Sequence, residues 1–278
     1  YCTTCGKNQP SRHLCYMKPK CRSAGNSASC LFVFYDLETM QETEIEKNTY
    51  LHQPNLCIMQ QVCPLCINDD NFDQSCAYCG VRQHIFTENP VDEFLDRLVS
   101  LSDKFKITAI AHNMRGFDGA FVLKNIFENV SRWKPQIMRT GTKLISITCG
   151  SSIRFIDSLN FIQLPLAQFS KAFKLPETKG YFPHFFNKRA NAEYDGSIPE
   201  PHYYGCESMP PKEREEFLKW HDELARNNYR FKMSDEILRY CLQDVNILRK
   251  GCLKFRECFL ETNNVDPFLE CLTIASAC

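Results

Sequence analysis

Two carboxylates, Asp36 and Glu38, close an apolar run that begins at Leu31. A run this rich in aromatic and β-branched residues predicts a buried central strand. Side chains two apart on a strand point to the same face, so the two carboxylates leave the strand together. Charge is costly at the end of a core strand unless a cation neutralises it. The pair therefore predicts a metal site or, alternatively, two carboxylates paired with Lys or Arg.

Two further stretches place polar side chains where a site could form. Asp118 follows a strand expected at residues 107–111 and stands at the start of a helix. A helix amino terminus favours a carboxylate, so capping explains Asp118 equally well. Tyr240 and Asp244 lie four residues apart on a helix expected over residues 233–259, so they share one face. Alone, such a pair is ordinary helix surface.

Four carboxylates at one edge of a sheet would form a metal centre. The order of elements, a strand hairpin followed by helix, strand, helix and helix, predicts an α/β fold with a mixed sheet flanked by helices. Sites in such folds gather at strand ends. Four carboxylates can hold two Mg²⁺ or Mn²⁺ ions about 4 Å apart, one making hydroxide from water and the other stabilising a leaving 3′ oxygen. This arrangement predicts hydrolysis of a phosphodiester.

The spacing of apolar residues elsewhere in the chain predicts the remaining strands and helices. Strands are expected at residues 53–62, 81–86, 136–139, 142–148 and 153–157, and helices at residues 90–101, 166–173 and 211–227. Gly141 and Gly150 mark tight turns between the last three strands. The long final helix should have Ser234 or Asp235 as its N-cap.

Two Cys-x-x-Cys pairs stand between the expected hairpin strands. They are Cys63 with Cys66 and, after nine residues, Cys76 with Cys79. Two such pairs at this spacing predict a Zn²⁺ ribbon inserted over residues 63–80. The zinc should be structural, because four sulfurs leave no open coordination position.

A second cysteine-rich segment occupies residues 1–30. This segment is polar and would need a bound metal ion or a covalent cross-link to become ordered. It predicts a second Zn²⁺ site or, alternatively, an arm with free thiols. The expected ligands are Cys2, Cys5, Cys15 and Cys21, with His13 as a possible substitute.

Composition narrows the class of protein. The 278 residues carry 33 basic and 33 acidic side chains, so a strongly basic nucleic-acid coat is not supported, although a local patch remains open. No apolar run approaches the roughly 20 residues that cross a bilayer, so no membrane partner is expected. Seventeen cysteines, several in Cys-x-x-Cys pairs, indicate zinc in a reducing intracellular compartment, nucleus or cytoplasm.

Three motifs resemble those of a known family, the 3′–5′ exonuclease domain of family B DNA polymerases. That domain has a ribonuclease-H-like (DnaQ-like) fold. The motifs are Asp36-Leu-Glu38-Thr39, Asn113-Met-Arg-Gly-Phe117-Asp118 and Tyr240-Cys-Leu-Gln-Asp244.

Other stretches are similar to the protein-primed branch of that family. Asp157-Ser158-Leu159 with Leu164 resembles its segment for single-stranded DNA, and the stretch from Lys179 to His184 resembles its lysine motif. The cysteine-rich additions and the last residues resemble polymerases of Maverick/Polinton-type transposons and related viruses.

The resemblance implies a role for each matched residue. The ligands of two Mg²⁺ or Mn²⁺ ions would be Asp36, Glu38, Asp118 and Asp244. Tyr240 would orient the attacking water, and Lys179 would stabilise charge on the phosphate. The residues holding the 3′ end of single-stranded DNA would be Thr39, Asn113, Phe117, Ser158, Leu159 and Leu164.

The resemblance also implies a domain organisation and a function. An exonuclease domain is expected at residues 31–260, with a second insertion at residues 181–230 and the start of a following module at residues 261–278. The expected function is proofreading by a DNA-directed, protein-primed polymerase, with a terminal priming protein and a polymerase module on the same full-length chain as partners. A stand-alone domesticated nuclease acting on RNA or DNA is an alternative. An inactive zinc-stabilised nucleic-acid-binding module is another.

Overall fold

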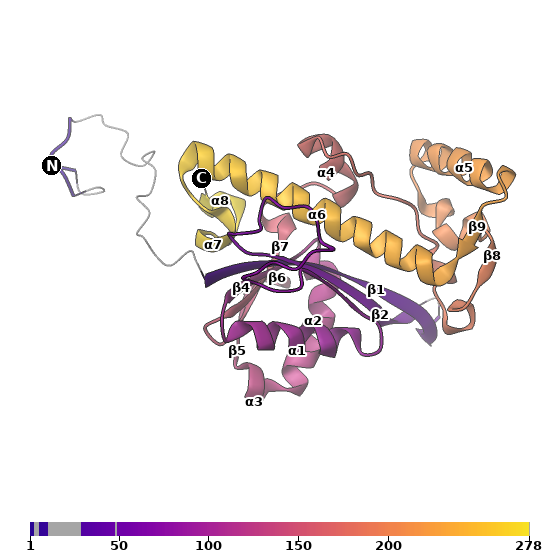
Figure 1. The fold of residues 1–278 in the computed structure, drawn as a ribbon, viewed down its shortest axis with the longest axis horizontal. Coiled ribbons are helices and arrows are strands. Elements are labelled where there is room, and N and C mark those ends of the chain that lie inside the picture. The colour runs from indigo at the N-terminus through magenta and orange to yellow at the C-terminus, as the bar shows by residue number, and fades with distance from the viewer. Residues whose placement is uncertain (3–5, 11–28, 48, 278) are drawn as a thin grey trace.

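The computed structural model describes residues 1–2, 6–10, 29–47 and 49–277, and its centre is a seven-stranded mixed sheet (Figure 1). The strand order is β3-β2-β1-β4-β7-β6-β5. Strands β1, β4 and β7 are parallel, and the other neighbours are antiparallel. The strands are β1 (Cys30–Glu46), β2 (Thr49–Val62), β3 (Gln83–Phe86), β4 (Lys106–Ala111), β5 (Pro135–Thr140), β6 (Lys143–Cys149) and β7 (Ile153–Asp157).

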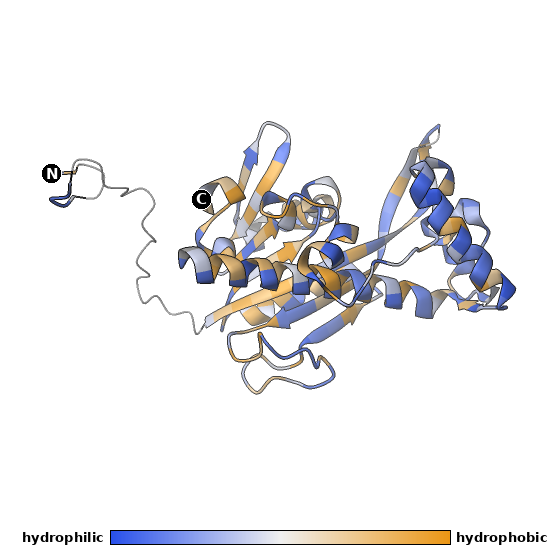
Figure 2. Cartoon of the chain, turned by 90° about the horizontal axis from the view of Figure 1, so that it is seen from above, coloured by the Kyte–Doolittle hydropathy of each residue, from blue (hydrophilic) through white to orange (hydrophobic). Residues whose placement is uncertain are grey.

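Strand β1 lies in the middle of the sheet, which explains its composition. It is hydrogen-bonded on both sides, and every residue from Leu31 to Tyr35 is buried. A strand covered on both faces is continuously apolar and does not alternate. Figure 2 shows apolar residues gathered along the start of this strand.

Helices cover the two faces of the sheet as separate layers (Figure 1). One face carries α1 (Pro90–Ser102), α2 (Asp118–Glu128) and α3 (Val130–Trp133). The other carries α4 (Leu166–Phe173) and the long α6 (Met233–Asn263), followed by α7 (Pro267–Glu270) and α8 (Ile274–Ala277). Among the described residues, no helix is both long enough and apolar enough to span a membrane.

The insertion expected at residues 181–230 lies beside the amino-terminal end of α6 (Figure 1). It contains α5 (Pro211–Arg226) and a small sheet of β8 (Asp195–Ser197) and β9 (Arg230–Lys232). Most of α5 is hydrophilic (Figure 2). Its apolar stripe packs into a small separate core around Tyr204, Cys206 and Phe217.

Short 3₁₀ turns connect many of these elements. They are Met114–Gly116, Ser158–Asn160, His184–Phe186, Arg189–Asn191, Pro201–Tyr204 and Cys206–Ser208. Gly141 and Gly150 have positive φ values of 59°, as expected for the tight turns beside β6.

The start of α6 differs from the expectation. Its N-cap is Lys232, without a side-chain cap, so Ser234 and Asp235 lie in the first turn. Lys232 is still paired with Asp195 in the β8–β9 sheet, so the chain passes directly from strand to helix.

The far end of α6 crosses the boundary expected at residue 260. The helix continues to Asn263, and Phe268 is fully buried between Phe32 and Phe161. Residues 261–277 therefore pack, as far as they are described, on the same core as the sheet.

Gly251 lies where α6 packs against α4. A Cβ there would meet Cδ2 of the fully buried Phe169 at 2.4 Å. Helix propensity would favour alanine by about 1 kcal/mol, but overpacking costs about 1–3 kcal/mol. We expect Gly251→Ala to lower the free energy of unfolding by up to about 2 kcal/mol, measured by urea unfolding.

Cys258→Ala, at an exposed position of the same helix, is the matched control and should change stability by less than about 0.5 kcal/mol. A Gly251→Ala protein more stable than the parent would contradict the expected clash with Phe169.

Candidate functional site

The first two carboxylates stand where β1 extends beyond its parallel neighbour. The pairing of β1 with β4 ends at Phe34 and Ile110, and Asp36 and Glu38 follow on β1. Asp118 is the first residue of α2, which the chain enters soon after β4 ends. The carboxyl ends of two parallel strands thus bring three carboxylates to one edge of the sheet.

Helix α6 supplies two further predicted catalytic side chains. Tyr240 and Asp244 are one turn apart, and both are buried. The thiol of Cys241 lies 3.7 Å from the Asp36 carboxylate, so this part of α6 packs directly on β1. A cavity of about 320 Å³ is lined by five of the six predicted catalytic residues, Asp36, Glu38, Asp118, Tyr240 and Asp244.

Lys179 reaches this cluster from the segment that follows α4. Its ammonium group forms an ion pair with Asp244 and lies 4.7 Å from the centre of the Tyr240 ring. Burial and the neighbouring Asp244 raise the pKa of Tyr240 well above its usual range, so its hydroxyl keeps its proton. The Gln243 amide donates a hydrogen bond to the carbonyl of Thr178, which fixes the segment against α6.

Burial and mutual repulsion shift the titration of the carboxylates. Burial and the neighbouring Asp244 raise the pKa of Asp36 to about 7. Burial and the charge of Asp36 raise the pKa of Glu38 and that of Asp118 well above their usual range. Burial also raises the pKa of Asp244, an effect that Lys179 opposes. One ammonium group, that of Lys179, is therefore too little positive charge for four clustered carboxylates at neutral pH.

The residues present fit divalent cations. Within the described part of the chain, Asp118 Oδ1 and Asp244 Oδ1 are buried and have no hydrogen-bond partner. Buried carboxylate oxygens without donors are costly, and carboxylate oxygen is the ligand that Mg²⁺ and Mn²⁺ prefer. Asp36, Glu38, Asp118 and Asp244 could therefore hold such ions.

A larger cavity of about 830 Å³ adjoins the first and shares Asp36 and Asp244 with it. Three predicted nucleic-acid-binding residues line it, Asn113, Leu159 and Leu164. Its cationic side chains are Arg115, Lys143 and Lys179. This mixture of apolar and cationic side chains suits the bases and the phosphate backbone of a single-stranded nucleic acid.

Thr39 and Phe117 line the smaller cavity instead. Thr39 is buried, with its hydroxyl 2.9 Å from His52 Nδ1, and the His52 ring packs edge-on against Phe117. Ser158 lines neither cavity. It is fully buried, and its hydroxyl lies 2.9 Å from His112 Nδ1, so it positions a histidine.

Three side chains of the site were not expected from the sequence. His112 lines both cavities, and His184 Nδ1 lies 3.7 Å from a Glu38 oxygen. Burial and Lys179 lower the pKa of His184 to about 4. The Cys241 sulfur, with oxygens of Asp36 and Glu38, lies within a cluster whose atoms are at most 4.8 Å apart. Two of the three carried a signal in the sequence, because His184 closes the lysine motif and Cys241 lies inside the third motif.

The inserted ribbon brings its four cysteine sulfurs together. The sulfur separations are 3.7 Å for Cys63–Cys66, 3.8 Å for Cys63–Cys76 and 3.6 Å for Cys66–Cys79. Tetrahedral Zn²⁺ with Zn–S bonds near 2.3 Å places sulfurs about 3.8 Å apart, so the cluster fits zinc. Gly80, with φ of +79°, makes the expected turn after the second pair.

The amino-terminal zinc site stays a prediction. Cys5, His13, Cys15 and Cys21 lie outside the described residues, and only Cys2 of the expected ligands lies within them.

Replacing two ribbon ligands should remove one zinc. We expect Cys66→Ser/Cys79→Ser to lose one zinc equivalent per chain, because two sulfurs cannot complete the tetrahedral shell. Zinc released to a chromogenic chelator after denaturation measures this. Cys258→Ser, at an exposed cysteine of α6, is the control and should keep the full zinc content. Equal zinc in both variants would contradict the ribbon site.

Asp36→Asn should stabilise the metal-free protein at high pH. An unfolded aspartate titrates near 3.8, whereas the pKa of folded Asp36 is about 7. The folded state therefore keeps the proton longer, and stability falls as pH rises through this window. We expect the variant to gain about 2–4 kcal/mol at pH 8 and nearly nothing near pH 4, measured by urea unfolding in EDTA.

Adding Mg²⁺ should shrink that gain, because the cation stabilises the parent carboxylate. Asp73→Asn, on the exposed surface of the ribbon, should show no such pH dependence. An equal gain in the free energy of unfolding at pH 4 and pH 8 would contradict the destabilisation of the ionised Asp36 by burial and by Asp244.

Comparison with known proteins places the chain in a family. A family model described as DNA polymerase type B, organellar and viral, matches residues 101–278. No curated protein sequence matches the chain. The matched range includes Asp118, Lys179 and Asp244, whereas Asp36 and the ribbon precede it.

Solved structures of Phi29 DNA polymerase are similar in fold. The complex with single-stranded DNA is 16% identical with a TM-score of 0.52, covering 89% of this chain and 34% of that one. The complex with primer-template DNA is 15% identical with a TM-score of 0.50, covering 89% and 33%. The chain thus spans about a third of these polymerases. The predicted mixed α/β fold is confirmed, and this chain belongs to the organellar and viral family of type B DNA polymerases.

Proposed function

We propose that this chain is a metal-dependent 3′–5′ exonuclease, the proofreading region of a protein-primed family B DNA polymerase. One observation carries the proposal. Four carboxylates from β1, α2 and α6 line a single cavity, and two of them present buried oxygens that lack hydrogen-bond partners among the described residues. Such a site suits two Mg²⁺ or Mn²⁺ ions.

Bound cations would supply an activated water and stabilise the leaving 3′ oxygen. The chain's own side chains position the reactants. Tyr240, whose ring lies 4.7 Å from the Lys179 ammonium group, can orient a water beside the carboxylates. The ammonium group of Lys179 can offset negative charge that develops on the phosphate.

The adjoining larger cavity is the proposed path of the single-stranded 3′ end. Arg115 and Lys143 can contact phosphates, while Leu159 and Leu164 contact sugars or bases. Phe117 is half-buried beside the carboxylates, where a terminal base can stack on it. Stacking of this kind contributes about 1–3 kcal/mol per base.

The proposed partners and source rest on the sequence motifs that resemble the protein-primed branch. We infer that a polymerase module belongs to the same full-length chain and that a terminal priming protein is a partner, as in the protein-primed branch. A transposon or viral source follows from the same resemblance. The four ribbon sulfurs lie 3.6–3.8 Å apart, at zinc-binding and not at disulfide distance, which suits a reducing compartment.

Loss of two ligands should abolish cleavage. We expect the parent to shorten a 5′-labelled DNA single strand stepwise from its 3′ end with Mg²⁺ or Mn²⁺ present. Asp36→Ala/Glu38→Ala should reduce the rate at least about a thousandfold, because the charge that organises the transition state is removed. Denaturing electrophoresis of quenched samples measures both rates.

Glu46→Ala, at the exposed end of the same strand, is the matched control and should cleave at the parental rate. Equal cleavage by the double variant would refute the site. A matched RNA strand degraded as fast as DNA would favour a nuclease that does not discriminate sugars. Tight binding of a primer terminus without turnover would favour an inactive binding module.

A further inference from the structure

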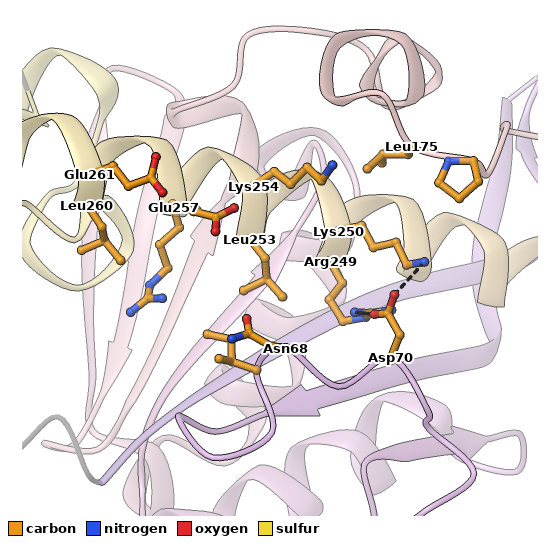
Figure 3. Close-up of a pocket in the computed structure, with 13 residues that line it drawn as sticks. Asn68, Asp70, Leu175, Arg249, Lys250, Leu253, Lys254, Glu257, Leu260 and Glu261 are labelled. Carbon is orange, nitrogen blue, oxygen red and sulfur yellow. Dashed lines mark hydrogen bonds and ion pairs between the residues drawn. The ribbon is translucent and has the colours of Figure 1, made fainter.

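The zinc ribbon docks on α6 through one acidic side chain. Asp70, on the ribbon loop, places Oδ1 2.8 Å from Arg249 Nη1 and Oδ2 3.0 Å from Lys250 Nζ. Figure 3 shows Asp70 pointing across the cleft toward these two residues of α6. The cleft continues along the helix past Leu253 and Leu260.

This contact differs from an ordinary surface ion pair. Asp70 is exposed, but only 2% of the Arg249 side chain is exposed. The guanidinium carbons of Arg82 and Arg249 lie 4.1 Å and 4.4 Å from the centre of the same ring, Phe72. A buried cation needs its counter-charge, so the ribbon loop supplies what Arg249 requires.

Arg249 also connects the ribbon to β2, the strand beside β1. Its Nε donates to Gln60 Oε1 at 2.7 Å, and the Gln60 amide donates to Asn246 at 2.9 Å. Gln60 is opposite Phe34 on β1, two residues before Asp36. Asn246 follows Asp244 by two residues on α6. The network therefore joins α6, which carries Asp244, to β2, the strand paired with β1.

Lys250 connects the ribbon to the segment that carries the catalytic lysine. Its ammonium group is shared between Asp70 and Glu177, with the Glu177 oxygen at 2.5 Å. Glu177 precedes Lys179 by two residues, and Thr178 between them accepts a hydrogen bond from Gln243 of α6. The ribbon thus reaches both the helix and the lysine segment through one carboxylate.

We propose that Asp70 is a positioning residue of the active site, through which the zinc ribbon aligns α6 and residues 175–179. This inference rests on the proposed exonuclease function and deepens it. Without Asp70, Arg249 loses the one carboxylate with which it forms an ion pair among the described residues, and Lys250 keeps only its ion pair with Glu177. The helix and the segment then lose a shared anchor, and small displacements of catalytic groups cost large factors in rate.

The test compares Asp70→Asn with Asp73→Asn, which removes the same charge from an exposed position of the same ribbon. Hydrogen–deuterium exchange of the zinc-loaded proteins should show about tenfold faster exchange in Asp70→Asn over residues 175–182 and 240–250. Strand β6 should be unchanged. The rate constant for cleavage of saturating single-stranded DNA should fall about tenfold with KM unchanged. A loss of this size is typical of side chains that orient a catalytic group without touching the substrate. Asp70→Glu should recover most of that loss.

Zinc content is measured in each variant, because Asp70→Asn could disturb the ribbon itself. Lys250→Gln leaves the ribbon intact and should speed exchange of residues 175–182 in the same way. Unchanged exchange in both variants, or the same change in Asp73→Asn, would overturn the proposal. Exchange is independent of activity, so a parent protein without nuclease activity would refute the proposed function while the exchange comparison still decides the role of Asp70.

Discussion

Repulsion among buried carboxylates is the constraint on which this structure depends. Asp36, Glu38, Asp118 and Asp244 line one small cavity, and burial with like charge raises the pKa of Asp36 to about 7. Lys179 offsets part of the charge through its ion pair with Asp244. Such a cluster destabilises the folded chain until cations bind, so the surrounding framework must hold it together.

That framework consists mainly of β1 and α6. The apolar half of β1 is hydrogen-bonded on both sides and buried on both faces, which fixes the strand before its acidic end. Helix α6 lies against β1, with Cys241 touching Asp36 and with Gly251 allowing close approach of Phe169 from α4. Rigid elements on both sides of a charged site are what a preorganised centre requires.

Both insertions lie beside the same helix. The residues around α5 pack near the start of α6 and have their own small core, while the zinc ribbon docks further along through Asp70 (Figures 1 and 3). Four sulfurs at zinc-binding distances explain how such a short, polar loop becomes ordered. The zinc ribbon can thus stabilise the helix that carries Tyr240 and Asp244 from a distance, whereas the other insertion reaches the site itself, with His184 3.7 Å from Glu38.

Local patterns in the sequence predicted the strands of the main sheet, most helix ends and the grouping of the ribbon cysteines, but not β8 and β9, because periodicity and short spacings are properties of neighbouring residues. Tertiary structure alone decided that Ser158 supports His112 instead of lining a cavity, that His184 approaches Glu38, and that Asp70 meets Arg249. These contacts join residues from 46 to 179 positions apart in the chain. No local pattern encodes contacts between residues so far apart in the chain, because these contacts follow from how the sheet, α6 and the insertions pack together.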